Sequence, residues 1–422
     1  MLVWLAVRFA RLLGGSGLAI ALTALSCAIA PMLMGMAATL NTSTFDPLAC
    51  TVIAYLLTKA LRENDNRALA LAGLVAGVAL EIKYAMVFWI VGLTIGLLLT
   101  PERRILQRPA FWVGAAIAAV IAAPSFAWQL LHGFPFLELG AAAKGKNVDV
   151  ALAPFMVNQA FVMNPLFAPL CIAGLIAPFL VARLRDLRFV GIGAIVVVII
   201  VRLGHGKDYY LAPVYPSLFV IGAVTLAPLA MGRPGKAIAG IAMACAVVIS
   251  ALVVPMALPV LSPATLASYI GRVGFAPAQQ ERSFKGTVLP QVFADQLGWR
   301  DFTDQVEAAW DRIPVSMRAD TGIKVDNYGE AAALDIYGQH LPPALTGHNQ
   351  YFLLGLRGQN PRNLLIVQDN PAALMPYCEN VTLLGKTWSR YAMAYENGKV
   401  IALCEKVRPP LIQLWPGLKN FS

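Results

Sequence analysis

The sequence predicts a multi-span α-helical membrane domain followed by a soluble α/β domain. Of the 422 residues, 58% are hydrophobic and 13% are charged, whereas a soluble protein carries roughly 25% charged residues. Apolar runs of spanning length recur through the first 260 residues. Beyond residue 260 the charged residues return, and no apolar run reaches that length. We therefore expect a membrane domain at residues 1–260 and a soluble domain at residues 261–422.

The membrane domain divides into about nine spans plus a partial first one. The initial run, Met1–Leu13, contains two arginines and lacks the polar start and cleavage site of a signal peptide. It resembles the end of a spanning helix, so we expect the domain to be incomplete at its N-terminus. The spans expected after it are Leu18–Leu40, Leu48–Leu61, Ala68–Leu80, Ala85–Leu99, Phe111–Leu131, Leu166–Val181, Phe189–Val201, Leu211–Ala230 and Ile238–Leu258.

The loops between these spans differ in their content of Lys and Arg. Taken alternately, one set of loops holds 13 cations and the other holds five. The positive-inside rule assigns the cation-rich set to the cytoplasm. The other face then carries the soluble domain and the polar residues Asp46, Lys83, His132, Lys144, Lys146, Arg202, His205, Lys207 and Asp208. The net charge of +10 arises in the membrane domain, so it does not indicate nucleic-acid binding.

The soluble domain mixes helical and strand patterns. Residues 292–310 have helical periodicity, and residues 324–337 read as strand, turn and helix. Residues 363–368 and 400–403 have the composition of buried strands. No glycine-rich nucleotide-binding motif occurs. The soluble part has two cysteines, Cys378 and Cys404, for which a disulfide and two unpaired buried thiols are about equally favoured.

A polar segment, Gly204–Pro216, separates two long apolar runs and holds several candidate site residues. Polar groups at membrane depth are costly unless they line a cavity or take part in chemistry. Three cations in this segment or just before it could hold a phosphate, or they could anchor helices at the membrane interface. They are Arg202, His205 and Lys207. Tyr209 and Tyr210 could contact a sugar or a prenyl chain, although an aromatic belt explains them more simply.

Two earlier segments add a lysine and a carboxylate on the same face. Lys83 lies beside Tyr84 and two residues after Glu81, so Lys83 and Glu81 could pair or line a polar cavity. Asp46 could act as a general base toward a sugar hydroxyl. Because Pro47 follows it, the alternative role of helix N-cap is favoured from this pattern alone. No cluster has metal-ligand spacing, so we predict no cofactor and leave a divalent metal open.

Several motifs, taken together and in order, resemble bacterial glycosyltransferase family 39, the protein-mannosyltransferase-like branch of the GT-C superfamily. This branch includes lipid A aminoarabinose transferases and rhizobial lipopolysaccharide-core galacturonosyltransferases. The resemblance extends over nearly the whole chain. Its motifs are Thr44-x-Asp46, Leu80-x-x-Lys83-Tyr84, Trp128-Gln129, His132-Gly133-Phe134-Pro135, Gly206-Lys207-Asp208-Tyr209-Tyr210-Leu211-Ala212-Pro213-x-Tyr215-Pro216 and Asn327-Tyr328-Gly329-Glu330-Ala331.

The resemblance implies transfer of a sugar from a polyprenyl-phosphate carrier to a lipid, glycan or protein acceptor, as in lipopolysaccharide biosynthesis. It places the protein in the bacterial inner membrane, with the soluble domain in the periplasm. Asp46 matches an acidic position near the catalytic site. The residues expected to surround the donor phosphate are Lys83, Lys207, His205 and Arg202. Those expected to contact the sugar or lipid are Tyr84, Asp208, Tyr209, Tyr210 and His132.

Two other classes of protein remain as alternatives. The family's principal acidic pair lies in a first outer loop that precedes Met1, which makes an inactive membrane anchor with a periplasmic binding domain more credible. A lipid or sugar transporter is less favoured, because matching halves with Gly- or Pro-interrupted segments are not visible.

Overall fold

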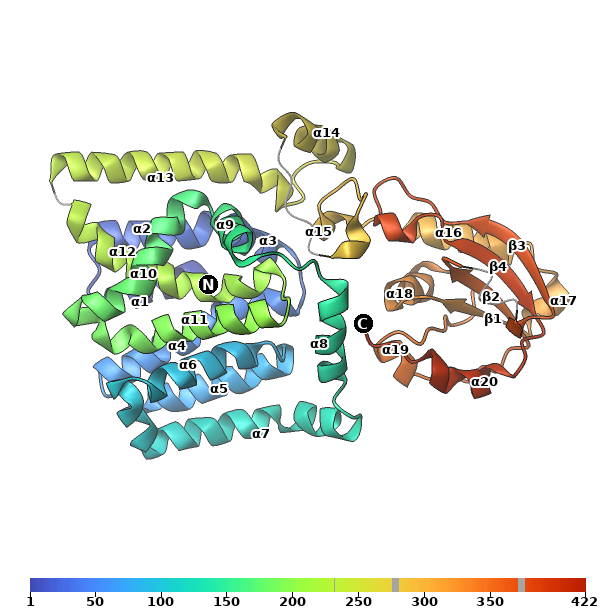
Figure 1. The fold of residues 1–422 in the computed structure, drawn as a ribbon, viewed down its shortest axis with the longest axis horizontal. Helices are drawn as coiled ribbons and strands as arrows, with labels where there is room; N and C mark the ends of the chain where they lie inside the picture. The colour runs from blue at the N-terminus through green and yellow to red at the C-terminus, as the bar shows by residue number, and fades with distance from the viewer. Residues whose placement is uncertain (231, 275–280, 371–375) are drawn as a thin grey trace. The chain divides into compact units, whose positions relative to one another are not determined.

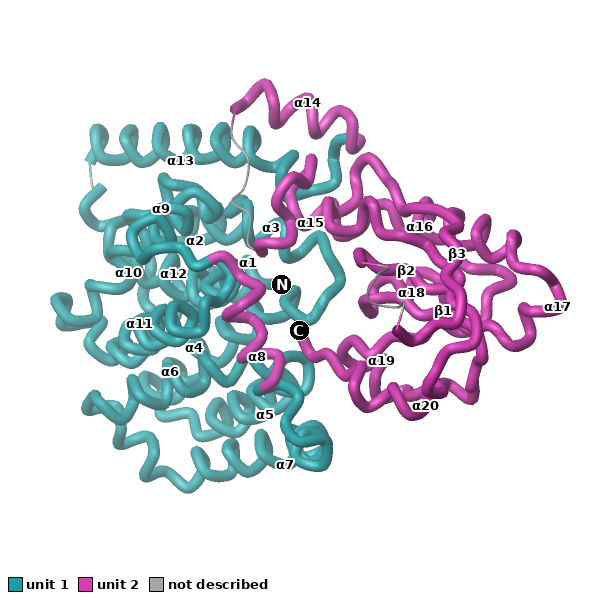
Figure 2. The backbone as a smooth tube through the Cα atoms, turned by 45° about the vertical axis from the view of Figure 1, so that its right-hand side comes forward, with its two compact units in different colours: residues 1–137, 149–261 teal, residues 138–148, 262–422 magenta. Residues whose placement is uncertain are grey.

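The computed structural model describes residues 1–230, 232–274, 281–370 and 376–422. The chain forms two compact units, shown in Figure 1 and coloured separately in Figure 2. The first unit contains Met1–Leu137 and Asp149–Leu261, and the second contains Glu138–Val148 and Ser262–Ser422. One polar loop between expected spans therefore belongs to the second unit, which a linear division of the sequence could not show.

The first unit is helical throughout its regular structure. Its helices are α1 (Leu2–Leu12), α2 (Gly17–Ile29), α3 (Pro31–Ala38), α4 (Asp46–Arg62), α5 (Asn66–Ile82), α6 (Met86–Leu98), α7 (Pro109–Leu131), α9 (Leu152–Val162), α10 (Ala168–Leu180), α11 (Arg188–Leu203), α12 (Tyr215–Leu226) and α13 (Arg233–Val253). Helix α8 (Pro135–Lys146) continues from this unit into the second.

Glycines allow several of these helices to approach closely. A Cβ atom added to Gly73 of α5 would lie 2.0 Å from the carbonyl oxygen of Gly114 in α7. One added to Gly222 of α12 would lie 1.9 Å from the carbonyl oxygen of Leu170 in α10. Small residues at such crossings are typical of helix packing in membranes, where close backbone contact replaces the hydrophobic effect as a source of stability.

Four helical segments are long and apolar enough to cross a bilayer, and three bent helix pairs would raise the number to seven. Both numbers refer to the described residues. The expectation of about nine spans plus a partial first span therefore remains a prediction. The expected span Leu18–Leu40 is divided into α2 and α3, which meet at 52° where Pro31 begins the second helix. Proline lacks the N–H that would continue the first helix. Helices α7 and α13 are largely exposed along their apolar windows, as expected for surfaces that face lipid.

The second unit contains a four-stranded mixed sheet in the order β1-β2-β4-β3. Strands β1 (Thr321–Val325) and β2 (Asn363–Gln368) are parallel, whereas β4 (Val400–Glu405) runs antiparallel to both β2 and β3 (Asn380–Lys386). The helices of this unit are α14 (Pro263–Val273), α15 (Gln291–Ala294), α16 (Trp299–Trp310), α17 (Val315–Arg318), α18 (Tyr328–Tyr337), α19 (Gln350–Leu353) and α20 (Leu411–Leu414).

Both faces of the sheet are covered by apolar side chains. Leu365 and Val367 of β2 pack into a core with α16 and α18, while Leu364 and Ile366 point into a second core on the opposite face. Because alternate residues of a strand face opposite sides, this burial accounts for the continuous apolar run in β2. The helix expected over residues 292–310 is interrupted at Gly298, whose φ of +86° cannot continue a helix.

A disulfide bond joins Cys378 to Cys404 of β4, with 5.4 Å between their Cα atoms. Of the two arrangements that the sequence left open, the structure has the bonded one. The bond connects the sheet to the chain that leads into β3, which is the most exposed strand of the sheet.

Candidate functional site

Three segments of the first unit bring the central candidate residues together. Asp46 is the first residue of α4, and Pro47 fixes the backbone of the same helical turn. Lys83 follows the end of α5 in an extended conformation. Tyr209 and Tyr210 belong to a 3₁₀ turn, Asp208–Val214, that leads into α12. The site is therefore built where helices end and polar side chains are available.

Lys83 is the residue that connects these segments. Its ammonium nitrogen lies 3.0 Å from Oδ2 of Asp46 and 2.5 Å from the hydroxyl oxygen of Ser43. The same nitrogen lies 5.3 Å and 5.0 Å from the ring centres of Tyr209 and Tyr210, within the range of cation–π attraction. The side chains of Lys83 and Asp46 are only 14% and 9% exposed. Removing either charge would leave the other buried without its partner.

The structure decides between the alternatives that the sequence left open for Asp46 and Glu81. The N-cap role proposed for Asp46 is wrong, because Phe45 occupies the cap position and Asp46 lies in the first turn of α4. Asn41 instead caps the short turn before α4. Glu81 accepts a hydrogen bond from the Ser125 hydroxyl at 2.7 Å, so its partner is Ser125 and not Lys83.

A small cleft, partly open to solvent, lies beside the Asp46–Lys83 pair. Asp46 and Tyr210 contribute the carboxylate and the phenol of its lining, and the other residues are mostly apolar. They are Cys50, Ala85, Met86, Phe88, Trp89, Val197, Pro213 and Val214. A mostly apolar cleft with a few converging polar groups is the usual form of a ligand site.

Asp208 has a structural environment that the sequence did not indicate. It is buried, and its carboxylate accepts a hydrogen bond from the Asn158 side chain. Gln159 donates to the Asp208 carbonyl oxygen at 3.3 Å and accepts from the Tyr215 hydroxyl at 3.1 Å. These two amides of α9 thus hold the 3₁₀ turn that presents the tyrosines. Asn158 and Gln159 form a polar pair within an apolar run of the sequence, and this pattern could have indicated their structural role.

The three cations in or just before Gly204–Pro216 differ in the residues that they contact. A guanidinium nitrogen of Arg202 lies 3.2 Å from the Asp149 carboxylate, and its guanidinium also packs over the Phe155 ring. His205 lies 4.0 Å from the same carboxylate. Lys207 precedes the turn whose tyrosines contact Lys83, so Lys83 and Lys207 lie at one end of the unit. Asp149, which sequence reasoning missed, lies beside both Arg202 and His205.

Tyr84 and His132 contact a different set of residues. The Tyr84 hydroxyl donates to the Ser125 carbonyl oxygen at 3.1 Å, and its ring packs against Phe136. His132 stacks on Trp128, with 4.2 Å between ring centres, at the end of α7. These contacts link Tyr84 and His132 to α7 and to the segment after it.

Across residues 1–230, 232–274, 281–370 and 376–422, no three His, Cys, Asp or Glu side chains gather in a way that could hold a metal ion.

Comparisons with known proteins address the family and the fold. Residues 1–128 match the model of the dolichyl-phosphate-mannose-protein mannosyltransferase family. Over 86 residues the chain is 38% identical to the lipid A galacturonosyltransferase RgtD of Rhizobium johnstonii, an alignment that covers 20% of this chain and 17% of that protein. The matched segment is thus a small part of this curated relative.

The fold resembles that of ArnT from Cupriavidus metallidurans. The crystal structure of ArnT bound to undecaprenyl phosphate has a TM-score of 0.51 and 14% identity, over 95% of this chain and 81% of ArnT. The apo structure gives the same TM-score and coverage with 16% identity. The family match over residues 1–128, the curated relative and the ArnT-like fold agree with the resemblance to GT-C glycosyltransferases that the sequence motifs indicated.

Proposed function

We propose that this protein transfers a sugar from a polyprenyl-phosphate donor to a lipid, glycan or protein acceptor on the periplasmic side of the bacterial inner membrane. The observation that supports this best is the Lys83 ammonium, which is largely buried between Asp46 and two tyrosines beside the cleft. A buried lysine beside an apolar cleft suits a ligand with an anionic head and a hydrocarbon tail. The undecaprenyl phosphate bound by ArnT has this chemistry.

The charges indicate how such a donor would be used. In the structure Lys83 is neutralised by Asp46, so a bound phosphate would compete with Asp46 for the same ammonium. We propose that phosphate binding transfers Lys83 to the phosphate and leaves the Asp46 carboxylate available as a base. Lys207, at the same end of the unit, would supply the second positive charge. Preorganised cations of this kind stabilise negative charge that develops on a leaving group.

The proposed reaction is a single displacement with inversion at the anomeric carbon. The acceptor hydroxyl oxygen forms a bond to this carbon while the bond from the carbon to the phosphate oxygen breaks. The hydroxyl proton passes to Asp46, and the electron pair of the broken bond leaves with the polyprenyl phosphate. The apolar lining by Met86, Phe88 and Trp89 would accommodate the first prenyl units.

A transfer assay with the chain in membranes tests this function. We expect sugar transfer from a polyprenyl-phosphate donor to membrane lipid or glycan acceptors, and we expect Lys207→Ala to abolish most of it. Lys144→Ala is the matched control, because Lys144 is an exposed lysine expected on the same face. Absence of transfer by the unchanged chain, over several donor sugars, would favour the inactive-anchor alternative. Equal rates for Lys207→Ala and the unchanged chain would remove Lys207 from the phosphate site.

The proposed orientation can be tested by labelling single cysteines from either side of the membrane. The exposed Cys245 is first replaced by alanine to lower the background. A cysteine at position 145 should then react with an impermeant reagent from the periplasm, whereas one at position 104 should react only after the cytoplasmic face is opened. The opposite pattern would place the proposed site on the wrong side for a periplasmic transferase.

A further inference from the structure

A buried hydrogen-bond network joins two helix breaks of the first unit. Asn164 lies at one break, where the chain bends by 101° between α9 and the segment that contains α10. Its side-chain amide donates to the Ala246 carbonyl oxygen at 2.8 Å and to the Ser250 hydroxyl at 2.9 Å, both in α13. The Ser250 hydroxyl donates to the carbonyl oxygen of Ile29 at 2.7 Å. Ile29 is the last residue of α2, directly before the bend of 52° into α3.

The polar groups of this network are matched to one another. Asn164 is fully buried, both N–H donors of its amide are used, and its Oδ1 accepts from the Leu166 N–H at 3.1 Å. The Ile29 carbonyl is one of those at a helix end that have no partner within the helix, and Ser250 supplies one. A buried network that is fully satisfied favours one arrangement of the elements it joins.

Two further features show that the break at Asn164 is held by its surroundings. Asn164 has a φ of +78°, a backbone conformation that costs free energy for a residue other than glycine. The buried residues of α13 are Ala246 and Ser250, the two that accept from Asn164. Helix α13, which is otherwise largely exposed, packs against α2 and against the turn that follows Asn164 (Figure 1). The buried part of α13 therefore coincides with the network.

Helix α3, beyond the first of these bends, leads to the lysine of the candidate site. It ends before Thr39, whose carbonyl oxygen accepts from the Thr44 hydroxyl. Thr44 belongs to the short turn Thr42–Phe45, which packs against α3 and leads into α4. The same turn carries Ser43, whose hydroxyl contacts the Lys83 ammonium. The direction of α3 after the bend thus determines where this turn lies.

Helix α9, before the other bend, holds the tyrosines of the candidate site. Asn158 and Gln159 donate to the carboxylate and the carbonyl oxygen of Asp208, the first residue of the 3₁₀ turn. The two tyrosines that follow Asp208 face the Lys83 ammonium. The helices that meet at the network therefore carry both parts of the site, one through α3 and the other through α9.

We propose that Asn164 and Ser250 are positioning residues, which fix α3 and α9 in the arrangement that brings the Asp46–Lys83 pair and the tyrosines together. Their effect on sugar transfer rests on the proposed function, whereas the arrangement of the helices does not. A displacement of about 1 Å in a catalytic site can cost on the order of 10²-fold in rate. Ser250→Ala should therefore lower the transfer rate per folded molecule at saturating donor by at least tenfold.

The arrangement of α3 and α9 can be measured without any transfer reaction. Double electron–electron resonance in nanodiscs gives the distance between nitroxides at Leu40→Cys, just beyond α3, and Leu152→Cys, at the start of α9. Both positions are exposed, and the exposed Cys245 is replaced by alanine. We expect one narrow distance distribution in the otherwise unchanged chain and a broader or shifted one in Ser250→Ala. Hydrogen exchange of the α10 and α12 amides should stay slow, which shows that the bundle remains folded.

Ser26→Ala is the matched control, because Ser26 is also buried and its hydroxyl bonds to Thr23 of the same helix, α2. It should leave both the distance distribution and the transfer rate nearly unchanged. Asn164→Gly removes the amide and tolerates the positive φ, so it should change the distances as Ser250→Ala does. Because the two residues share one network, the double variant should change them no further than the more affected single variant.

Several results would contradict the proposal. Unchanged distances in folded Ser250→Ala, an equal change in Ser26→Ala, or additive changes in the double variant would each refute a shared positioning role. Changed distances with an unchanged transfer rate would refute its importance for the reaction. If the unchanged chain transfers no sugar while the distances respond as expected, the proposed function fails and the positioning of α3 and α9 is supported.

Discussion

Lys83→Ala should lower the rate of sugar transfer by on the order of 10²–10³-fold, the usual effect of removing one preorganised group that stabilises developing negative charge. The expectation follows from the position of the Lys83 ammonium, which is 3.0 Å from Asp46 and largely buried beside the cleft. In this setting the charge acts on a bound phosphate through little intervening water. The measurement is the initial rate of transfer from a polyprenyl-phosphate sugar at saturating donor.

A structural role for Lys83 would also reduce the rate, because Lys83→Ala leaves the Asp46 carboxylate buried without its partner. The double variant Lys83→Ala/Asp46→Asn separates the two roles when binding of undecaprenyl phosphate is measured, since it also lacks the proposed base and is not expected to transfer sugar. It removes both charges and should fold as well as the unchanged chain. If Lys83 acts on the phosphate, the double variant binds undecaprenyl phosphate as weakly as Lys83→Ala. If Lys83 only neutralises Asp46, the double variant regains most of the binding, and the proposed phosphate contact is refuted.

Two further variants define what the site requires of this residue. Lys83→Arg keeps the charge and should retain more activity than Lys83→Ala, although a planar guanidinium differs in shape from an ammonium. Lys59→Ala is the matched control, since Lys59 forms an ion pair of 2.9 Å with Asp65 near the other end of α4. It should transfer sugar at nearly the unchanged rate. An equal loss in Lys59→Ala would show that the assay responds to damage anywhere in the bundle.

The sequence predicted the helical and mixed α/β character of the two parts because that character depends on composition and period. The limits of β2 were predicted to the residue, since a strand buried on both faces is continuously apolar. Strand β3 was missed, because it is largely exposed and has no apolar pattern. The break of the expected span at Pro31 was also missed, because the apolar run continues through it. A run of apolar residues indicates which residues are buried or face lipid, but it does not indicate the angle at which two helices meet.

The candidate site was predicted as a set of residues on one face, but their pairing was not. Lys83 contacts Asp46 across 37 residues of sequence, whereas its neighbour Glu81 contacts Ser125. Sequence proximity favoured a pair between Lys83 and Glu81, and the packing of α4 against α5 determines the actual one. Asp149 lay in a segment that read only as a polar loop, yet it contacts Arg202 and His205. Such partners are brought together by the tertiary structure, so the residues near Asp149 in the sequence do not indicate them.

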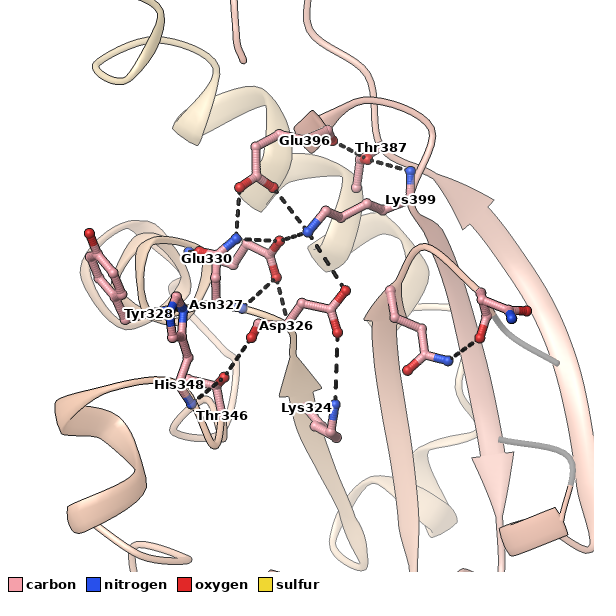
Figure 3. Close-up of polar contacts among 12 residues, drawn as sticks. Lys324, Asp326, Asn327, Tyr328, Glu330, Thr346, His348, Thr387, Glu396 and Lys399 are labelled. Atoms are coloured by element: carbon pink, nitrogen blue, oxygen red, sulfur yellow. Dashed lines mark hydrogen bonds and ion pairs between the residues drawn. The ribbon is translucent and has the colours of Figure 1, made fainter. Parts of the chain in front are cut away.

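The largest effect on stability is expected in a buried cluster of charges in the second unit. Lys399, the residue before β4, contacts Glu330 of α18, and lies 3.5 Å from Glu396 and 3.7 Å from Asp326 (Figure 3). Its side chain is 4% exposed and that of Glu330 is fully buried. Burial, with the charge of Glu396, raises the pKa of Glu330 to about 8. Burial lowers the pKa of Lys399, but the surrounding carboxylates outweigh it and the net direction is upward.

Lys399→Met should therefore destabilise the second unit by about 3–5 kcal/mol above pH 8, where Glu330 is ionised, the usual cost of removing one partner from a buried ion pair. Methionine fills a similar volume, so the loss reports charge and not a cavity. The loss should shrink as the pH falls below 8, because Glu330 is then protonated in the folded state of both chains and no longer needs the lysine. Above pH 8 the folded state of the variant must either keep the Glu330 proton, which the unfolded chain releases, or bury a bare carboxylate. The penalty should therefore increase as the pH rises beyond 8.

Hydrogen exchange of the β2 and β4 amides measures this opening of the second unit within the full chain, without a two-state transition of the whole protein. Lys406→Met is the matched control, because Lys406 pairs with Glu379 at 2.8 Å where both side chains are exposed. Solvent screens such a pair, so this variant should exchange almost as slowly as the unchanged chain. Equal exchange in Lys399→Met and Lys406→Met would show that the buried cluster contributes no more than a surface pair. A loss in Lys399→Met that did not vary with pH would instead indicate a packing defect.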